Sequence, residues 1–442
     1  MKFSFYTLGC KVNQYETQAM EQQLQALGHE IGDFQSPCDG YIINTCTVTA
    51  VADKKNRAVI RRCRRLNPEA IVAVCGCYAQ VNPADIRALG VDVLGGSGDR
   101  QEFIAMLLQA AREKRRMERV DDSMHRRTFE VLPAGGLEAR TRAMLKVQDG
   151  CSNFCSYCII PYARGPVRSE SLADAVEQTR ALAAAGYREI VVTGIEIASW
   201  GQDLPGKPGL SQLLSAICQA APTVRIRLGS LEPRIVDESF CALNRFDNLC
   251  PQFHLSLQSG SDSVLRRMRR KYDTGRYLES VRLLHQAFPG CAITTDIIVG
   301  FPGETEEEFA QTLDFAEQCA FAAVHVFPYS RRPGTPASKM PGQITKQEKE
   351  RRSARLLETA GWLERQYLEH LVGTAQPVLF EEPAGAYFTG HAPNYAKVYA
   401  AGQSLHNQLR TVRITGLYED GVLGEIVSSP DGKIPEKIAN SP

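Results

Sequence analysis

Short apolar runs alternate with helical patterns from the start of this 442-residue chain to about residue 330. In the N-terminal part, the runs KFSFYTLG, DGYIINT, AIVAVCG and VDVLGG are each followed by a helical pattern. Alternation at this spacing predicts a doubly wound, mostly parallel α/β sheet, because each helix returns the chain to the edge where the next strand starts. We expect these helices near residues 15–28, 50–66, 83–89 and 101–116.

The alternation resumes in the middle of the chain with six candidate strands: AMLKVQ, EIVVTG, VRIRLG, FHLSLQ, AITTDIIVG and AAVHVFPY. Helical patterns separate them, near residues 172–185, 210–221, 261–288 and 306–319. Six successive units predict a partial (β/α)6 barrel, since eight would close a full one. Barrel enzymes carry their chemistry on the loops after the strands. Here those loops read DGCSNFCSYC, TGIEIASWG, LGSLEP, LQSGSD and GFPGET.

A charged helical pattern at 346–371 ends the middle region, and short β-like runs with glycine turns follow it. These runs predict a small C-terminal all-β barrel. A polar, basic segment that ends in PAGG is typical of a linker between the first two regions. The expected parts are an N-terminal domain at 1–112, a linker at 113–136, a central domain at 137–370, a C-terminal domain at 371–433 and a tail at 434–442.

Composition narrows the class of protein. We find no apolar run long enough to span a membrane, and MKFSFYTLGCKVNQ lacks the pattern of a secretory signal, so we expect a cytoplasmic protein without membrane contact. In a reducing compartment, the 14 cysteines are expected to be metal ligands, reactive thiols or buried apolar residues. Basic runs at 61–65, 112–116 and 266–271 indicate either solvated helix faces or contacts with a polyanion.

The loop CSNFCSYC spaces Cys151, Cys155 and Cys158 as C-x3-C-x2-C. Thiolates at this spacing can bind three irons of a cubane and leave the fourth iron open, whereas a zinc site would need a distant fourth ligand. On these residues the sequence resembles the radical S-adenosylmethionine superfamily. The resemblance implies that the three cysteines hold a [4Fe-4S] cluster, and that the amino and carboxylate groups of S-adenosylmethionine chelate the open iron.

Three more cysteines each follow a predicted strand: Cys10 in TLGCKVNQYET, Cys46 in NTCTVT and Cys77 in CGCYAQ. The topology brings these strand ends to one edge of the sheet. A single cysteine in an apolar strand is usually a core residue, but three at equivalent ends favour a second cluster. Cys75 is an ambiguity, because alternation along a strand points Cys75 and Cys77 the same way. The cysteines without partner spacing are interpreted as structural: Cys38, Cys63, Cys218, Cys241, Cys250, Cys291 and Cys319.

A cluster-binding α/β domain, a radical S-adenosylmethionine barrel and a small β domain form the layout of the methylthiotransferases, which the chain resembles over about residues 2–430. The resemblance implies that Cys10, Cys46 and Cys77 hold a second [4Fe-4S] cluster, which carries the sulfur to be inserted. GCYAQ is the family form, and it favours Cys77 over Cys75. S-adenosylmethionine would be both the methyl donor and the source of a 5′-deoxyadenosyl radical that activates a C–H bond of the substrate.

The sequence motif around the first cysteine differs between the subgroups of this family. Lys11, Val12 and Asn13 in LGCKVNQYET are similar to the subgroup that acts on N6-threonylcarbamoyladenosine at position 37 of tRNA. The subgroups that modify isopentenyladenosine or a ribosomal protein have GCQMN and GCPKN, and ADKKNR at 52–57 supports the same choice. The resemblance implies the product 2-methylthio-N6-threonylcarbamoyladenosine, with tRNA, an external electron donor and a sulfur source as partners.

The resemblance also suggests cofactor and RNA contacts. Its candidates for lining S-adenosylmethionine are Tyr157, Gly194, Glu196, Gln258 and Gly300, although the glycines also suit strand-to-helix turns. The C-terminal segment resembles a TRAM domain, an RNA-binding β-barrel, through GHAPNYAKV at 390–398. Its candidate RNA contacts are Tyr387, Phe388, Tyr395, Lys397, Arg410 and Arg413. Each of them could instead be a core or surface residue of the barrel without a role in RNA binding.

Two rival functions stay open at this point. The first is the same chemistry on isopentenyladenosine tRNA or on a ribosomal protein. The second is a non-catalytic, zinc-dependent RNA-binding protein, which predicts about four thiolate ligands per site and a colourless preparation. We find neither a Ser-His-Asp grouping nor a Walker-type phosphate loop, so the sequence gives no support to a hydrolase or a nucleotidase.

Overall fold

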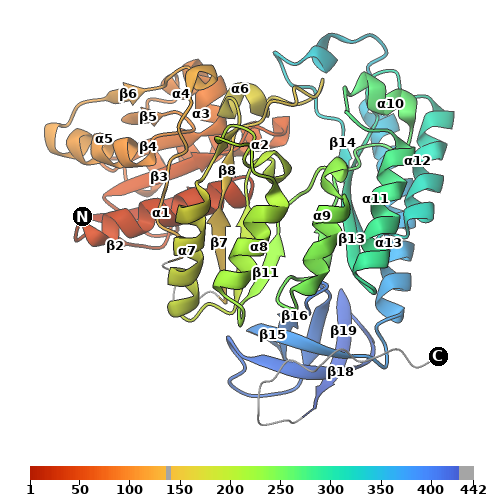
Figure 1. Cartoon of the computed structure of the whole chain (residues 1–442). Coiled ribbons are helices and arrows are strands. Elements are labelled where there is room, and N and C mark those ends of the chain that lie inside the picture. Colours follow the sequence, from red (N-terminus) through yellow and green to blue (C-terminus); the bar gives the residue numbers. More distant parts are fainter. Residues whose placement is uncertain (136–140, 428–442) are drawn as a thin grey trace.

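The computed structural model describes residues 1–135 and 141–427. It consists of an N-terminal α/β domain, a central α/β domain and a C-terminal β-barrel, which are coloured from red to blue in Figure 1. The fold class expected from the sequence is therefore confirmed. The tail expected at 434–442 lies outside the described residues.

The N-terminal domain is a six-stranded parallel sheet with strand order β2-β1-β3-β4-β5-β6. This order places a topological switch point between β1 and β3, and ligands bind at the carboxyl ends of the strands beside such a point. The strands are β1 (Lys2–Thr7), β2 (Glu30–Ile31), β3 (Gly40–Thr45), β4 (Ile71–Gly76), β5 (Val93–Gly95) and β6 (Met117–Arg119).

Helices cover both faces of this sheet. Two of them pack on one face, where Met20 and Phe103 bury against Phe3, while the others bury Ile60 and Ile86 on the opposite face. Thr49 caps the start of the second helix, because its side chain accepts from the Ala52 N–H at 3.1 Å. The helices are α1 (Lys11–Ala26) and α5 (Arg100–Glu113) on the first face, and α2 (Ala50–Leu66), α3 (Cys77–Val81) and α4 (Pro83–Arg87) on the second.

The segment expected to be a linker, 113–136, differs from that expectation. Its residues 117–119 form β6, which pairs in parallel with β5 and completes the sheet. The short 3-10 helix η1 (Ser123–His125) follows, and the Ser123 hydroxyl donates to the Tyr162 carbonyl oxygen of the central domain at 2.7 Å. The strand escaped prediction because Met-Glu-Arg at a sheet edge carries no run of apolar residues.

The central domain has the six strands that the sequence predicts, in chain order around an open barrel. They form two three-stranded parallel sheets, β11-β10-β7 and β12-β13-β14, joined by isolated parallel bridges between 226 and 249 and between 231 and 255. The strands are β7 (Arg142–Lys146), β10 (Glu189–Thr193), β11 (Arg225–Leu228), β12 (Gln252–His254), β13 (Ala292–Val299) and β14 (Ala323–Pro328), and the short β8 (Gln148–Asp149) pairs with β9 (Arg168–Ser169).

Helices pack on the outside of these strands, around a core that includes Trp200, Phe253 and Phe309. They are α6 (Ile160–Arg164), α7 (Leu172–Ala184), α8 (Leu210–Ala220), α9 (Glu238–Cys241), α10 (Asp262–Arg267), α11 (Thr274–Ala287), α12 (Glu306–Cys319) and α13 (Lys346–Glu369). Four 3-10 turns lie among them: η2 (Ile197–Ser199), η3 (Pro233–Ile235), η4 (Ala242–Arg245) and η5 (Pro336–Lys339).

One helix prediction was wrong in extent. The pattern at 261–288 forms two helices, because α10 ends at Arg267 and α11 begins at Thr274. Arg269 between them has a φ of 59°, a left-handed conformation that a helix does not contain. Asp273 then caps α11 by accepting from the Arg276 N–H at 2.8 Å. The break turns part of the basic run at 266–271 into a loop.

The C-terminal domain is a closed barrel with strand order β15-β16-β17-β19-β18. It docks against the central domain largely through its main chain. Arg225 donates to the carbonyl oxygens of Pro377 and His391, each at 3.1 Å, and Arg227 donates to the Pro393 carbonyl oxygen at 2.9 Å. The strands are β15 (Ala375–Ala384), β16 (Tyr387–His391), β17 (Lys397–Ala400), β18 (Leu409–Tyr418) and β19 (Gly421–Ile426).

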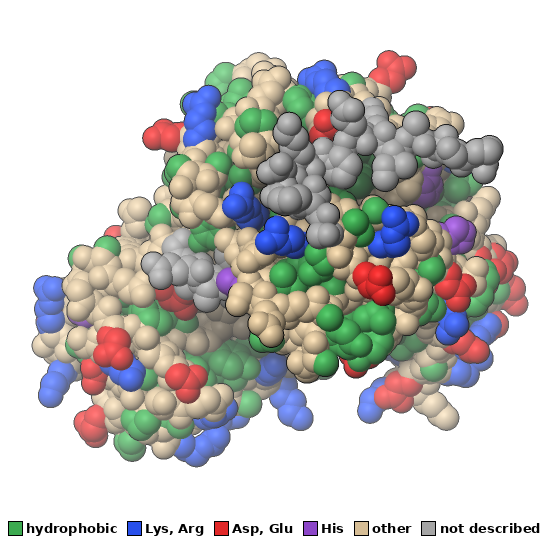
Figure 2. All heavy atoms as spheres, turned by 90° about the horizontal axis from the view of Figure 1, so that it is seen from below, with side chains coloured by type: hydrophobic (Ala, Val, Ile, Leu, Met, Phe, Trp, Pro, Cys, Tyr) green, Lys and Arg blue, Asp and Glu red, His purple; other side chains and the backbone are tan. Residues whose placement is uncertain are grey.

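Surface charge is mixed rather than segregated. Figure 2 shows acidic and basic side chains interspersed on the face seen from below, in keeping with a formal net charge of +1. Two of the basic runs form ion pairs within the chain: Arg64 pairs with Asp92 at 2.6 Å, and Arg267 pairs with Glu308 at 2.7 Å. Among the described helices, none combines the length and the apolar character needed to cross a bilayer.

Gly76, at the end of β4, provides a test of this fold. Its φ is 96°, and a Cβ added there would lie 2.5 Å from the Thr45 carbonyl oxygen. Gly76→Ala should therefore lower the free energy of unfolding by about 1–3 kcal/mol or more, measured by thermal unfolding. The control is Gly361→Ala in α13, where nothing lies within 4 Å of the new Cβ and a gain of about 0.5–1 kcal/mol is expected. If Gly76→Ala were as stable as wild type, the left-handed conformation and close packing described for Gly76 would be wrong.

Candidate active site

The first cysteine triplet, Cys151, Cys155 and Cys158, lies on the loop after β8. The Cys151 N–H donates to the Gly165 carbonyl oxygen at 2.9 Å, and the Cys158 N–H donates to the Cys155 carbonyl oxygen at 3.0 Å. Burial raises the pKa of the Cys151 and Cys158 thiols to about 12, and nearby Cys155 adds to the increase. Desolvated thiols this close together resist ionisation unless a bound metal supplies positive charge.

The loop between the two helices α10 and α11 holds this triplet in place. Ser156 donates from its N–H to the Met268 carbonyl oxygen at 3.0 Å and from its hydroxyl to the Arg267 carbonyl oxygen at 2.8 Å. Arg270, which is also in the loop, donates from Nη1 to the Cys155 Sγ at 3.3 Å. The helix break therefore delivers a guanidinium group to one sulfur of the triplet, a contact that the sequence analysis missed.

The second triplet gathers at the switch point of the N-terminal sheet. Cys10 follows β1, Cys46 follows β3 and Cys77 follows β4, and negative charge on any one of them would raise the pKa of a neighbour. Gly9, with a φ of 115°, lets the chain pass so close that an added Cβ would lie 3.1 Å from the Cys46 Sγ. Cys10 is exposed, whereas Cys46 and Cys77 are buried, so the site opens on the side of Cys10.

The structure separates Cys75 from Cys77. β4 ends at Gly76, whose φ of 96° and ψ of −169° interrupt the alternation of the strand, and Cys77 begins α3. The expectation that alternation points both side chains the same way was therefore wrong. Cys75 lies in the apolar core with Ile42 and Val93, whereas Cys77 lies near Cys10.

The donor sets suit a cluster better than a single ion. Three sulfurs bound to one tetrahedral zinc lie about 3.8 Å apart, given a zinc–sulfur bond of about 2.3 Å. Among the described residues, only His254, Asp296 and His325 bring three ligand atoms within 4.8 Å of one another, so both cysteine triplets are more widely spaced. Soft thiolates are the usual ligands of iron–sulfur clusters, and three of them leave one iron of a [4Fe-4S] cluster open.

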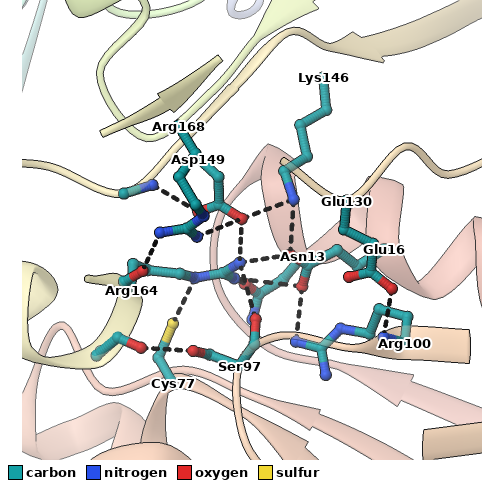
Figure 3. Close-up of polar contacts among 12 residues, drawn as sticks. Asn13, Glu16, Cys77, Ser97, Arg100, Glu130, Lys146, Asp149, Arg164 and Arg168 are labelled. Atoms are coloured by element: carbon teal, nitrogen blue, oxygen red, sulfur yellow. Dashed lines mark hydrogen bonds and ion pairs between the residues drawn. The ribbon is translucent and has the colours of Figure 1, made fainter. Parts of the chain in front are cut away.

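Arg164 of the central domain contacts the second cysteine site (Figure 3). It belongs to IIPYARG, the sequence that directly follows the first triplet, and its guanidinium group is fully buried. Its Nε donates to the Cys77 Sγ at 3.2 Å, and its Nη2 donates to the Asn13 Oδ1 at 2.7 Å. Its Nη1 donates to Glu16. A residue of the central domain thus contacts a cysteine of the N-terminal domain.

Glu16 is the anionic centre of this network. Arg100 pairs with it at 3.0 Å and Lys146 at 3.3 Å, and Arg164 completes a ring of three cations. Burial alone would raise the pKa of Glu16, but these cations outweigh that effect and hold the pKa below its usual value. Asp149, which pairs with Lys146 at 2.7 Å, carries the second buried negative charge.

A cavity of about 190 Å³ lies beside the first triplet. It is lined by Cys158, Tyr157, Gln258 and Asp296, together with Tyr329 of the loop after β14. Gln258 has a φ of 74°. Two sequence-predicted candidates, Tyr157 and Gln258, therefore share one cavity with a cysteine of the first triplet.

The other three candidates occupy different positions. Glu196 accepts from the Asn153 Nδ2 of the cysteine loop at 3.0 Å, and burial and then Glu232 raise the pKa of Glu196 to about 7. Gly194 lets the chain pass the Gln148 carbonyl oxygen, which would lie 2.9 Å from an added Cβ. Gly300 does not line this cavity, and it packs against Lys349 of α13 instead.

The candidate RNA contacts divide into three groups. Phe388 packs on the core of the barrel, and Tyr387 contacts the Tyr418 ring edge-on with centroids 5.3 Å apart. Arg410 and Arg413 are exposed. Tyr395 and Lys397 line a hollow that faces the other two domains.

Matches to known families follow this division of the chain. Residues 145–316 match the Radical SAM superfamily, and residues 2–95 match a family described as "Uncharacterized protein family UPF0004". A solved structure of the radical S-adenosylmethionine methyltransferase TsrM from Kitasatospora setae shares the fold, with a TM-score of 0.56 and 16% identity over 87% of this chain and 79% of that one. The fold and the first cysteine site define a radical S-adenosylmethionine enzyme.

Curated relatives narrow the class. The chain is 42% identical over 407 residues to the threonylcarbamoyladenosine tRNA methylthiotransferase MtaB of Bacillus subtilis, covering 90% of each protein. It is 34% identical to the tRNA-2-methylthio-N(6)-dimethylallyladenosine synthase of Acidothermus cellulolyticus, covering 95% of this chain and 87% of the relative. The chain belongs to the MtaB-type family of radical S-adenosylmethionine tRNA methylthiotransferases. Membership implies S-adenosylmethionine and a [4Fe-4S] cluster, which the first triplet fits.

Arg164→Gln tests the link between the domains. The change removes a cation from buried Glu16 and the N–H donor from Cys77, so the free energy of unfolding of the N-terminal domain should fall by about 3–5 kcal/mol. Amide hydrogen exchange resolved by segment would locate the loss in α1 and α3. The control is Arg127→Gln, an exposed arginine nearby, with an effect of at most about 0.5 kcal/mol. If the protection of α1 against hydrogen exchange is unchanged, the network does not hold the two domains together.

Proposed function

We propose that this enzyme adds a methylthio group to C2 of N6-threonylcarbamoyladenosine at position 37 of tRNA, forming 2-methylthio-N6-threonylcarbamoyladenosine. The observation that carries the proposal is the presence of two cysteine triplets, with buried Arg164 from the segment that follows the first triplet in contact with Cys77 of the second, in a chain similar to a protein with this name. A reaction that both activates a carbon and inserts a sulfur needs two such sites.

In this proposal, Cys151, Cys155 and Cys158 hold the cluster that binds S-adenosylmethionine, and Cys10, Cys46 and Cys77 hold a second [4Fe-4S] cluster. When bound, these groups supply a methyl donor, a hydrogen-abstracting radical and the sulfur to be transferred. Electrons and replacement sulfur come from external partners. We keep the central domain at 137–370 and the C-terminal domain at 371–433 as expected from the sequence, and we extend the N-terminal domain through β6 at the expense of the expected linker.

The side chains of the protein position and shield these groups. Burial of Cys46 and Cys77 keeps water from two of the three sulfurs of the second site, while exposed Cys10 leaves an approach for the substrate base. Tyr157 and Gln258 line the cavity beside Cys158, where a cofactor nucleoside would fit. Glu196 holds the cysteine loop through Asn153. The C-terminal barrel is proposed to bind the RNA as a TRAM domain.

Nucleoside analysis of tRNA tests the substrate. A strain that lacks this chain should lose 2-methylthio-N6-threonylcarbamoyladenosine and accumulate N6-threonylcarbamoyladenosine, measured by liquid chromatography and mass spectrometry. Expression of the chain should restore the product. If the strain instead loses the methylthio group of isopentenyladenosine, the enzyme would carry out the reaction for which its relative from Acidothermus cellulolyticus, 34% identical, is named.

Single cysteine substitutions test the two sites. Purified anaerobically, the wild type should contain about eight iron atoms per chain, and Cys77→Ala and Cys155→Ala about four each. Cys77→Ala should still cleave S-adenosylmethionine but transfer no methylthio group, whereas Cys155→Ala should do neither. Cys75→Ala is the matched control and should keep the full iron content, because Cys75 lies in the apolar core.

Two results would contradict this assignment. Stoichiometric zinc without iron would favour the non-catalytic RNA-binding alternative. If Cys75→Ala loses the second cluster while Cys77→Ala retains it, the ligand has been assigned to the wrong cysteine.

A further inference from the structure

A large polar hollow lies where the three domains meet. It consists of two adjoining cavities of about 390 and 510 Å³, and Lys11, Arg227 and Tyr395 line both of them. Lys11 comes from the N-terminal domain, Arg227 from the central barrel and Tyr395 from the C-terminal barrel. The hollow therefore exists only in the assembled chain.

The hollow adjoins the cavity beside the first cysteine site. Asp296 of β13 lines both the larger cavity and the cavity that contains Cys158. Lys11 itself follows Cys10 and begins α1. A nucleoside between the two cysteine sites would therefore have Lys11 within the space available to its substituents.

Lys11 is a cation without a partner. The structure gives it no hydrogen bond and no ion pair with any residue in 1–135 or 141–427, and its side chain is exposed to the hollow. The neighbouring cation Arg227 differs, since its Nε donates to Glu189 at 2.7 Å and its other donors are used on main-chain carbonyl oxygens. Lys397, on the far wall, is held by Asp420 at 3.0 Å.

Two arginines, Arg142 and Arg227, line the cavity beside this ammonium group. Arg142, Arg225 and Arg227 all pair with the single buried carboxylate of Glu189. Glu381 pairs with Arg142 and His391, so it is not available to Lys11 either. An anionic ligand that reaches Lys11 would meet a field that already favours negative charge.

Tyr395 and His391 form an aromatic part of the wall of the hollow. Tyr395 stacks on His391 with ring centroids 4.6 Å apart, and Arg227 lies 4.7 Å from the centre of the tyrosine ring. The tyrosine hydroxyl accepts from the Arg142 Nη1 at 3.2 Å. Its φ of 70° is left-handed, so packing holds the ring in this place against a backbone preference.

We propose that Lys11 binds the carboxylate of the threonylcarbamoyl group, and that the hollow between Lys11, Arg227 and Tyr395 receives this substituent; the inference rests on the proposed function. A threonylcarbamoyl group carries a carboxylate, a hydroxyl and a urea-like linkage, all of which suit a polar hollow with an unpaired ammonium group. A dimethylallyl group is apolar and offers nothing to Lys11. The site thus selects the substituent by charge.

Binding of RNA stem-loops by the anaerobically reconstituted holoenzyme tests this site. Three stem-loops differ at one nucleoside only: N6-threonylcarbamoyladenosine, its neutral methyl ester, and adenosine. Wild type should bind the carboxylate form about 10-fold or more tightly than the other two, measured by fluorescence anisotropy. Lys11→Met should bind all three alike, and Lys11→Arg, which keeps the charge, should retain most of the preference.

Two controls separate the possible explanations. Lys397 lines the same hollow, but Asp420 already neutralises its charge. Lys397→Met should therefore change the affinity for all three stem-loops by one common factor at most, and the ratio between them should stay that of wild type. Iron content of Lys11→Met should equal that of wild type, which shows that the neighbouring Cys10 site is intact. If Lys11→Met weakens all three stem-loops by one common factor, Lys11 contacts an RNA phosphate and the inference is wrong.

The inference and the proposed function fail in different ways. If wild type converts the carboxylate stem-loop to product while Lys11→Met keeps the full preference for that stem-loop, only the inference is overturned. If wild type has no preference among the stem-loops and forms no product from the carboxylate form, the proposed function is overturned.

Discussion

Glu16 is almost completely buried, and its negative charge is stabilised by the three cations that surround it. One of these, Arg100, belongs to the same domain, but Lys146 and Arg164 come from the central domain. Removing a carboxylate from water costs several kcal/mol unless its partners are in place, so the N-terminal domain reaches its lowest free energy only when docked. The same Arg164 contacts Cys77, and the domain interface is therefore part of the cysteine sites.

Parallel strands explain why cysteines far apart in sequence converge. β1, β3 and β4 all run in the same direction, so the residues that follow them share one edge, and Cys10, Cys46 and Cys77 gather there. In the central domain, the first cysteine triplet likewise lies beyond the end of a strand, on the loop after β8. The buried network holds these two edges face to face, because it is built from residues directly beside both triplets.

The sequence predicted the features that depend on local patterns. Apolar runs located the strands, and caps such as Thr49 and Thr305 agree with the predicted helix starts. It did not predict contacts made by single charged residues across domains, such as that of Arg164, although IIPYARG beside the cysteines was a signal. Nor did the basic run at 266–271 reveal that Arg269 breaks the helix and that Arg270 turns toward Cys155.

The docking of the C-terminal barrel has an evolutionary consequence. Arg225 and Arg227 hold the barrel by its main-chain carbonyl oxygens, which every amino acid possesses. Substitutions on the barrel surface away from Glu381 and Tyr395, whose side chains contact Arg142, can therefore accumulate without loosening these main-chain contacts. The outer face of the barrel can therefore change in sequence over evolution while the barrel keeps its position on the central domain.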